Sequence, residues 1–98
     1  MTSATFNSLA EQELIDAADY YEAQKPGLGL ELLEEVEHSI NFLVRFPEAG
    51  AKVRDSIRRL VLPKFPYSIL YRVVETGQLR ILAIAHHKRR PQYWIDRD

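Results

Sequence analysis

Hydrophobic residues in the first quarter of the chain recur with the period of an α-helix. They form one stripe at intervals of three and four positions: Leu14, Ala17, Ala18 and Tyr21. Ser8 followed by Glu11 has the spacing of a capping box, in which each side chain binds the other residue's main-chain N–H. The Lys-Pro-Gly sequence at 25–27 ends the pattern, because proline disfavours helix in the residue before it. The pattern predicts an amphipathic helix that begins at a Ser8 cap and ends before Lys25.

A second apolar stripe follows and predicts a helix from about Leu28 to Arg45. Four residues form this stripe: Leu33, Val36, Ile40 and Leu43. Polar residues between them are expected to face water: Glu31, Glu34, Glu35 and His38. The FPEAG sequence at 46–50 has turn chemistry and stops the helix. The two helices therefore form a hairpin with an apolar face that needs covering.

The rest of the chain has the composition of β-strands. Residues 53–62 mix arginine with valine, isoleucine and leucine, and residues 67–74 are rich in β-branched and aromatic side chains. Residues 79–85 are apolar on both faces, which predicts a central strand, and residues 76–78 supply a hairpin connection before it. With a short strand at 4–7, the predicted order is β-α-α-β-β-β. The predicted fold class is α+β, with the helical hairpin packed on one face of a small, mostly antiparallel sheet.

Composition places the chain among ordinary globular proteins. Its 98 residues, 46% hydrophobic and 28% charged, suit one domain over 1–98 and are too apolar for disorder. The lack of cysteine excludes disulfides and thiolate metal sites and suits a reducing compartment. No signal-peptide pattern is present, and no apolar run approaches the roughly 20 residues that span a bilayer. We therefore expect a cytoplasmic protein with no membrane partner.

The net charge of −1 hides a strong asymmetry between the two halves of the chain. Residues 1–51 hold two bases and ten acids, a balance of −8, whereas residues 52–98 hold eleven bases and four acids, a balance of +7. Such a division suggests a basic surface that meets an anionic partner. The alternative is that acidic helices simply lie over a basic sheet.

An ordered series of short sequences resembles the RelE/ParE family of toxins, and more closely its ParE-like side. The series covers nearly the whole chain and consists of AADYYE at 17–22, PGLG at 26–29, FPEAG at 46–50, RRL at 58–60, FPYSILYR at 65–72 and AIAHHKRRPQYW at 83–94. The resemblance implies the toxin of a type II toxin–antitoxin system, which inhibits growth and is neutralised by a cognate antitoxin in a hetero-oligomer. RelE-like members cut mRNA on the ribosome, and ParE-like members inhibit DNA gyrase without a known chemical step.

A metal-independent endoribonuclease needs a base, a cationic clamp for the phosphate and an acid. Under the hypothesis of an endoribonuclease, the candidate catalytic residues are His86, His87, Arg59, Arg72 and Tyr93. The two histidines are adjacent near a strand end, so their side chains should face opposite ways and only one should share a surface with a given arginine. For Arg72 we favour a structural role, paired with a carboxylate or a carbonyl group.

The end of the chain supplies candidate antitoxin- or target-binding residues: Lys88, Arg89, Arg90, Tyr93 and Trp94. The three bases suit an acidic antitoxin or a phosphate, or are merely solvated. The aromatic pair suits base stacking, although we favour aromatic anchors that fold the end of the chain onto the sheet. Tyr20, Tyr21 and Tyr71 lie in apolar stripes and are expected at or near the core. The sequence has no metal-ligand spacing and no cofactor motif.

The balance of charge bears on the choice of target. A protein that acts inside the ribosome meets a dense phosphate field and is expected to be strongly basic, but the pI of this chain is about 6.3. The tyrosine-rich first helix and the strand with the FPY sequence are also closer to ParE-like members. Inhibition of DNA gyrase is therefore the favoured prediction, and a ribosome-dependent mRNA endoribonuclease is the alternative. In the first case the chain is not an enzyme, and in the second it is.

Overall fold

The computed structural model describes residues 3–75 and 78–98. In chain order its elements are β1 (Ser3–Phe6), α1 (Ser8–Gln24), α2 (Leu28–Arg45), β2 (Ala51–Arg54), β3 (Ile57–Val61), β4 (Tyr67–Glu75) and β5 (Gln78–His86). The predicted connection at 76–78 lies largely outside the described residues. No helix in the described ranges has the length and apolar character needed to cross a membrane.

The five strands form one sheet in the order β1-β5-β4-β3-β2. Strand β1 pairs with β5 in parallel, and the other neighbouring strands pair antiparallel. The predicted α+β fold is therefore confirmed, and β5 lies between two strands as expected. One strand was not foreseen: the run at 53–62 is broken by a tight turn in which Asp55 has a φ of 49°. Aspartate tolerates this left-handed conformation better than most residues, so the run folds into the β2–β3 hairpin.

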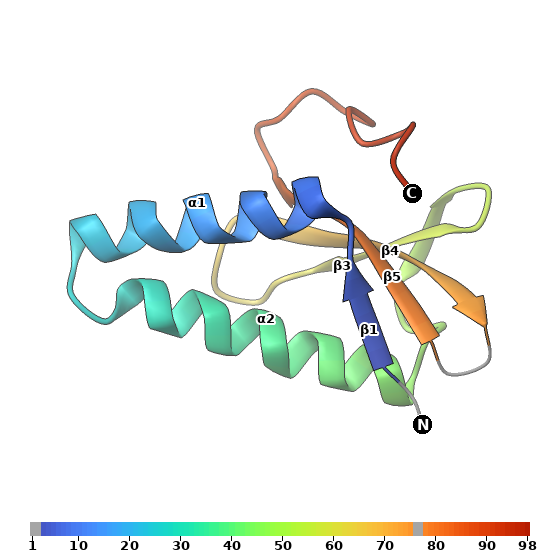
Figure 1. The fold of residues 1–98 in the computed structure, drawn as a ribbon, viewed down its shortest axis with the longest axis horizontal. Coiled ribbons are helices and arrows are strands. Elements are labelled where there is room, and N and C mark those ends of the chain that lie inside the picture. The colour runs from blue at the N-terminus through green and yellow to red at the C-terminus, as the bar shows by residue number, and fades with distance from the viewer. Residues whose placement is uncertain (1–2, 76–77) are drawn as a thin grey trace.

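The helical hairpin covers one face of the sheet (Figure 1). Its buried contacts centre on Leu32, Val36 and Leu43 of α2, which pack with Ile69 and Ile81 of the sheet. The predicted bounds of the second helix are confirmed, and so are Val36 and Leu43 of the predicted stripe, but its first member is wrong by one residue. Leu33 is 39% exposed whereas Leu32 is fully buried. The offset arises because a helix of 3.6 residues per turn allows either neighbouring leucine to complete the stripe, and packing decides between them.

The start of the first helix differs from the prediction. Asn7, not Ser8, is the cap, and its Oδ1 accepts a hydrogen bond from the Leu9 main-chain N–H at 2.8 Å. Ser8 is the first helical residue, so the predicted capping box with Glu11 is wrong. Both asparagine and serine are favourable caps, and the strand β1 ends at Phe6, which leaves Asn7 at the junction.

The tyrosines expected near the core divide between core and surface. Tyr71 is fully buried, Tyr21 is half-buried against the core, and Tyr20 is 60% exposed, so the prediction for Tyr20 is wrong. The Tyr71 hydroxyl donates to the Pro47 carbonyl at 2.7 Å and accepts from the Gly50 N–H at 2.9 Å. It thereby ties the segment after α2 to the centre of the sheet.

The segment of residues 87–98, called the tail below, folds over the face of the sheet opposite the helices (Figure 1). Trp94 is 6% exposed and packs with Leu70, Leu82 and Ala83, and Tyr93 packs beside this cluster. The prediction that the aromatic pair anchors the end of the chain on the sheet is confirmed. Two apolar clusters therefore enclose the sheet, one under the helices and one under the tail.

Replacement of Tyr71 by phenylalanine tests the link between the sheet and the segment after α2. Tyr71→Phe leaves the Gly50 N–H and the Pro47 carbonyl without their partner, so we expect a loss of about 1–3 kcal/mol in the free energy of unfolding. Urea denaturation measures this loss. The matched control is Tyr20→Phe, which removes an exposed hydroxyl and should change stability by less than about 0.5 kcal/mol. Equal effects of the two substitutions would contradict the role given to Tyr71.

Candidate functional site

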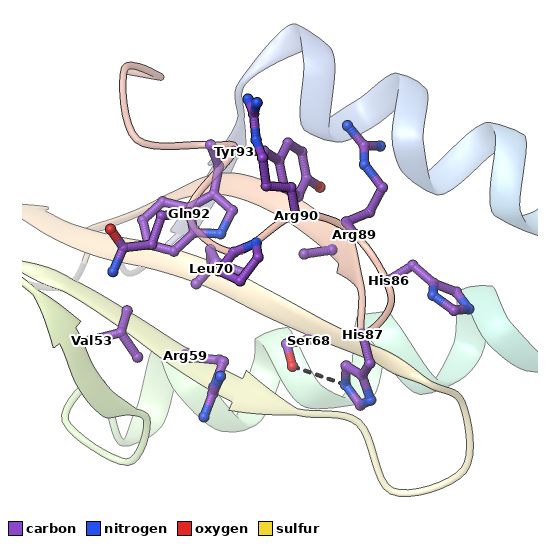
Figure 2. A pocket seen from close by; sticks show the side chains of 13 residues that line it. Val53, Arg59, Ser68, Leu70, His86, His87, Arg89, Arg90, Gln92 and Tyr93 are labelled. Carbon is purple, nitrogen blue, oxygen red and sulfur yellow. Dashed lines mark hydrogen bonds between the residues drawn. The ribbon is translucent and has the colours of Figure 1, made fainter.

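A groove of about 350 Å³ lies between the tail and the sheet. The polar residues that line it include Arg59 from β3, Ser68 from β4, and His87, Arg90 and Gln92 from the tail. Figure 2 shows Arg59 and His87 along the strand side and Arg90 along the tail side. We call this feature the tail groove.

Apolar side chains support the tail groove from below. Leu70, Ala85 and Trp94 line it and belong to the buried cluster under the tail, and Val53 packs against that cluster. Trp94 therefore supports the groove as a buried residue and presents little surface to a partner. Rigid packing beneath the groove fixes the main chain from which the rim residues extend.

The two histidines have different surroundings, as their adjacent positions predicted. The His87 Nε2 lies 3.1 Å from the Ser68 hydroxyl in the tail groove (Figure 2). The His86 ring instead packs edge-on against Tyr67, with 4.9 Å between the ring centroids, and its Nδ1 accepts from the Lys88 N–H at 3.0 Å. Both histidines line the groove, but only His87 has a hydrogen-bonding partner among its polar side chains.

The two arginines predicted as phosphate clamps are also separated. The guanidinium of Arg59 lines the tail groove. Arg72 does not line it and lies 3.4 Å from the Asp98 carboxylate near the end of the tail. This contact matches the structural pairing that we favoured for Arg72.

The Tyr93 hydroxyl is committed to a partner on the first helix. It donates to the Glu13 carboxylate at 2.7 Å. Burial, and then this hydrogen bond to Glu13, raise the pKa of the Tyr93 phenol above its ordinary value of 10. The Arg89 guanidinium lies over the Tyr93 ring, 3.9 Å from its centroid. Tyr93 is therefore poorly placed to give a proton to a molecule in the tail groove.

Glu13 is the residue that the sequence interpretation missed. Its carboxylate is bonded to Arg97 at 2.8 and 3.0 Å and accepts the Ile84 main-chain N–H at 3.1 Å. Both side chains of the pair are largely buried, with 16% of Glu13 and 13% of Arg97 exposed. A signal was present, because Glu13 stands on the buried side of its helix between Ala10 and Ala17.

The basic run on the tail divides into groups with different contacts. Lys88, Arg89 and Arg90 are all exposed. Arg89 and Arg90 both line the tail groove, but only Arg89 also contacts the Tyr93 ring and lies 4.0 Å from Glu13. No carboxylate lines the groove, so its polar rim consists mainly of hydrogen-bond donors and positive charge. Such a rim is suited to an anion.

The described residues hold no cluster of three or more histidine, aspartate or glutamate side chains arranged to bind a metal. The chemical groups gathered in the groove are guanidinium, imidazole, hydroxyl and amide. His87 is the one titratable group among them that has a hydrogen-bonding partner in the groove. The arrangement thus favours binding over proton transfer.

Removal of the Glu13 charge tests whether Glu13 holds the tail in place. Glu13→Gln leaves the Arg97 guanidinium without its counter-charge, so we expect a loss of about 1.5–3 kcal/mol in the free energy of unfolding. Trp94 is the single tryptophan of the chain, so its fluorescence emission should shift to the red as the tail detaches. Asp19→Asn, on the exposed side of the same helix, is the charge-matched control and should leave both readings unchanged. A Glu13→Gln protein with native stability and native emission would refute the role of Glu13.

Comparison with known proteins places this architecture in a family. No curated protein matches the chain. A solved chain of the chromosomal ParDE TA system from P. aeruginosa is similar in fold, with a TM-score of 0.73, 24% sequence identity, and coverage of 88% of this chain and 96% of that one. Residues 5–91 match the family described as the ParE toxin of the type II toxin–antitoxin system, parDE. The chain therefore belongs to the ParE toxin family.

Proposed function

We propose that the chain is a growth-inhibiting toxin that acts on DNA gyrase and that a cognate antitoxin neutralises it. Membership of the ParE family supports this proposal. Arg59, His86, His87 and Tyr93 all line the tail groove, and Arg72 does not. The observation that carries the choice of gyrase over mRNA is that most of the side chains that an endoribonuclease would need are held by structural partners. His86 packs on Tyr67, Arg72 pairs with Asp98, and the Tyr93 hydroxyl binds Glu13. Both targets are cytoplasmic, so the proposal places the toxin in that compartment.

One observation favours the alternative of a ribosome-dependent endoribonuclease. Arg59, Ser68 and His87 do meet in the tail groove, and a histidine beside a cation is a combination found in nucleases that need no metal. A second acid or base is still required for cleavage. His86 and Tyr93 also line the groove, but the His86 ring packs on Tyr67 and the Tyr93 hydroxyl is bonded to Glu13. The alternative therefore ranks below gyrase inhibition.

The antitoxin is proposed to contact the basic run of the tail. Lys88, Arg89 and Arg90 are exposed side by side, and the half of the chain that contains them has a balance of +7. An acidic to amphipathic segment that crosses the sheet and this run would gain charge complementarity. Toxin and antitoxin would then form a hetero-oligomer.

The choice of target is tested by whether DNA synthesis or protein synthesis stops first after the chain is expressed in a cell. The chain is expressed from a tight promoter in a sensitive bacterium, and DNA and protein synthesis are followed by pulse labelling within minutes. We expect DNA synthesis to fail first, and we expect the purified chain to inhibit supercoiling of relaxed plasmid by gyrase. His86→Ala should retain both effects, because His86 is packed on Tyr67. An early stop in protein synthesis with intact replication, together with cleaved mRNA, would contradict the proposal.

The antitoxin contact is tested by charge reversal. A variant with Lys88→Glu, Arg89→Glu and Arg90→Glu should bind the antitoxin encoded beside it at least about tenfold more weakly, because each like-charge contact at an interface is unfavourable. Isothermal titration calorimetry measures the change in Kd. A control of equal charge carries Arg45→Glu, Lys52→Glu and Lys64→Glu, three exposed positions outside the tail. Equal weakening by both variants would show a general effect of net charge and would place the contact elsewhere.

A further inference from the structure

Most arginines of the chain are already engaged by other groups of the protein. Those with main-chain, carboxylate or amide partners are Arg54, Arg58, Arg72, Arg80 and Arg97. Those that contact an aromatic ring are Arg45 and Arg89. Such contacts use the donors and part of the charge of each guanidinium for internal structure.

Arg59 and Arg90 are the exceptions. Within residues 3–75 and 78–98, neither guanidinium has a hydrogen bond, an ion pair or a ring contact. Both residues are exposed, and both line the tail groove. They belong to different elements, Arg59 to β3 and Arg90 to the tail, and in Figure 2 their side chains extend in opposite directions from the two sides of the groove. The two uncommitted arginines of the described chain therefore border the same groove.

We propose that the tail groove binds the phosphodiester backbone of DNA, with Arg59 and Arg90 as its two phosphate contacts. A guanidinium presents paired donors that match phosphate oxygens, and an uncommitted one loses no internal contact on binding. The Ser68 hydroxyl, paired with His87 in the same groove, and the Gln92 amide add uncharged donors. No carboxylate in the lining opposes an anion.

The lining favours a nucleic acid over an acidic protein segment. Protein partners gain most of their affinity from a few anchors at the centre of the interface, chiefly aromatic side chains and arginines packed in desolvated pockets. None of the large apolar side chains that are exposed in the described chain lines the tail groove. A protein that reaches Arg90 must therefore anchor elsewhere, whereas phosphate binding needs only positive charge and donors.

The contacts also predict how sequence affects binding. The face of the Tyr93 ring is occupied by the Arg89 guanidinium, and Trp94 is 6% exposed. Neither ring is open for a base to stack on, so the groove should contact the backbone alone and bind DNA without sequence preference. Identification of this DNA as the DNA held by gyrase rests on the proposed function. The binding of DNA by the groove is independent of the proposed function and can be measured without gyrase.

The test is fluorescence anisotropy with the full chain and a labelled 20-base-pair DNA duplex of arbitrary sequence. Two phosphate contacts predict a slope of about −2 for log K against log salt, which is about 15-fold weaker binding at 200 mM than at 50 mM salt. Arg59→Gln and Arg90→Gln should each weaken binding severalfold and lower the magnitude of the slope by about 1. A scrambled duplex should bind equally well.

Arg45→Gln is the matched control, because it removes the same charge from an exposed residue at the end of α2. It should bind DNA like the parent chain, and all variants should keep the parent's thermal unfolding temperature.

Three outcomes would overturn the inference. Arg59→Gln and Arg90→Gln could bind DNA as tightly as Arg45→Gln does, the chain could bind polyglutamate and not DNA, or RNA could bind more than about tenfold tighter than DNA. DNA binding without gyrase inhibition would reject the proposed function alone. Gyrase inhibition without DNA binding would reject this inference alone.

Discussion

The position of the tail depends on one carboxylate. Strand β1 pairs with β5 only as far as Phe6 opposite Ile81, although β5 continues to His86. Beyond that point the edge of β5 would leave main-chain groups without partners, at a cost of about 1–3 kcal/mol for each buried group. Glu13 accepts the Ile84 N–H, and Arg97, bonded to Glu13, donates to the Leu82 carbonyl at 3.2 Å. An ion pair between the first helix and the tail thus replaces the missing length of strand.

This arrangement has consequences for the groove. Because Glu13 also binds the Tyr93 hydroxyl, it fixes the ring on which Arg89 lies, and Trp94 is held in the apolar cluster beside it. Two of the tail's charged side chains, Arg89 and Arg97, are therefore directed toward Glu13, whereas Arg90, which lines the groove beside Arg89, has no such contact. The same interaction that completes the sheet thus gives Arg89 and Arg97 an internal counter-charge and leaves Arg90 without one.

The local parts of the fold were accessible from the sequence, and the long-range parts were not. Periodicity gave both helices, and an apolar run gave the central strand β5, because each depends on neighbours within a few residues. The cap at Asn7, the buried Leu32 and the turn at Asp55 were missed, since each competes with an adjacent residue of similar propensity. The Glu13–Arg97 pair joins residues 84 positions apart. No local pattern indicates such a partner, although an acid on the apolar side of a helix signals that one is needed.

The charge asymmetry of the chain has a different meaning in three dimensions. The interpretation that acidic helices lie over a basic sheet agrees with the structure, because the helices carry most of the acids and most arginines of the basic half are engaged inside the protein. The interpretation that a basic surface meets an anionic partner stays a prediction. The balance of +7 therefore overstates the positive charge that a partner meets. A pI of about 6.3 argues against a long-range field that attracts nucleic acid, but it does not argue against contact. Over a screening length of about 10 Å in ordinary salt, a ligand in the tail groove meets Arg59 and Arg90 rather than the net charge. For the proposed binding of DNA, local geometry therefore matters more than the total charge of the chain.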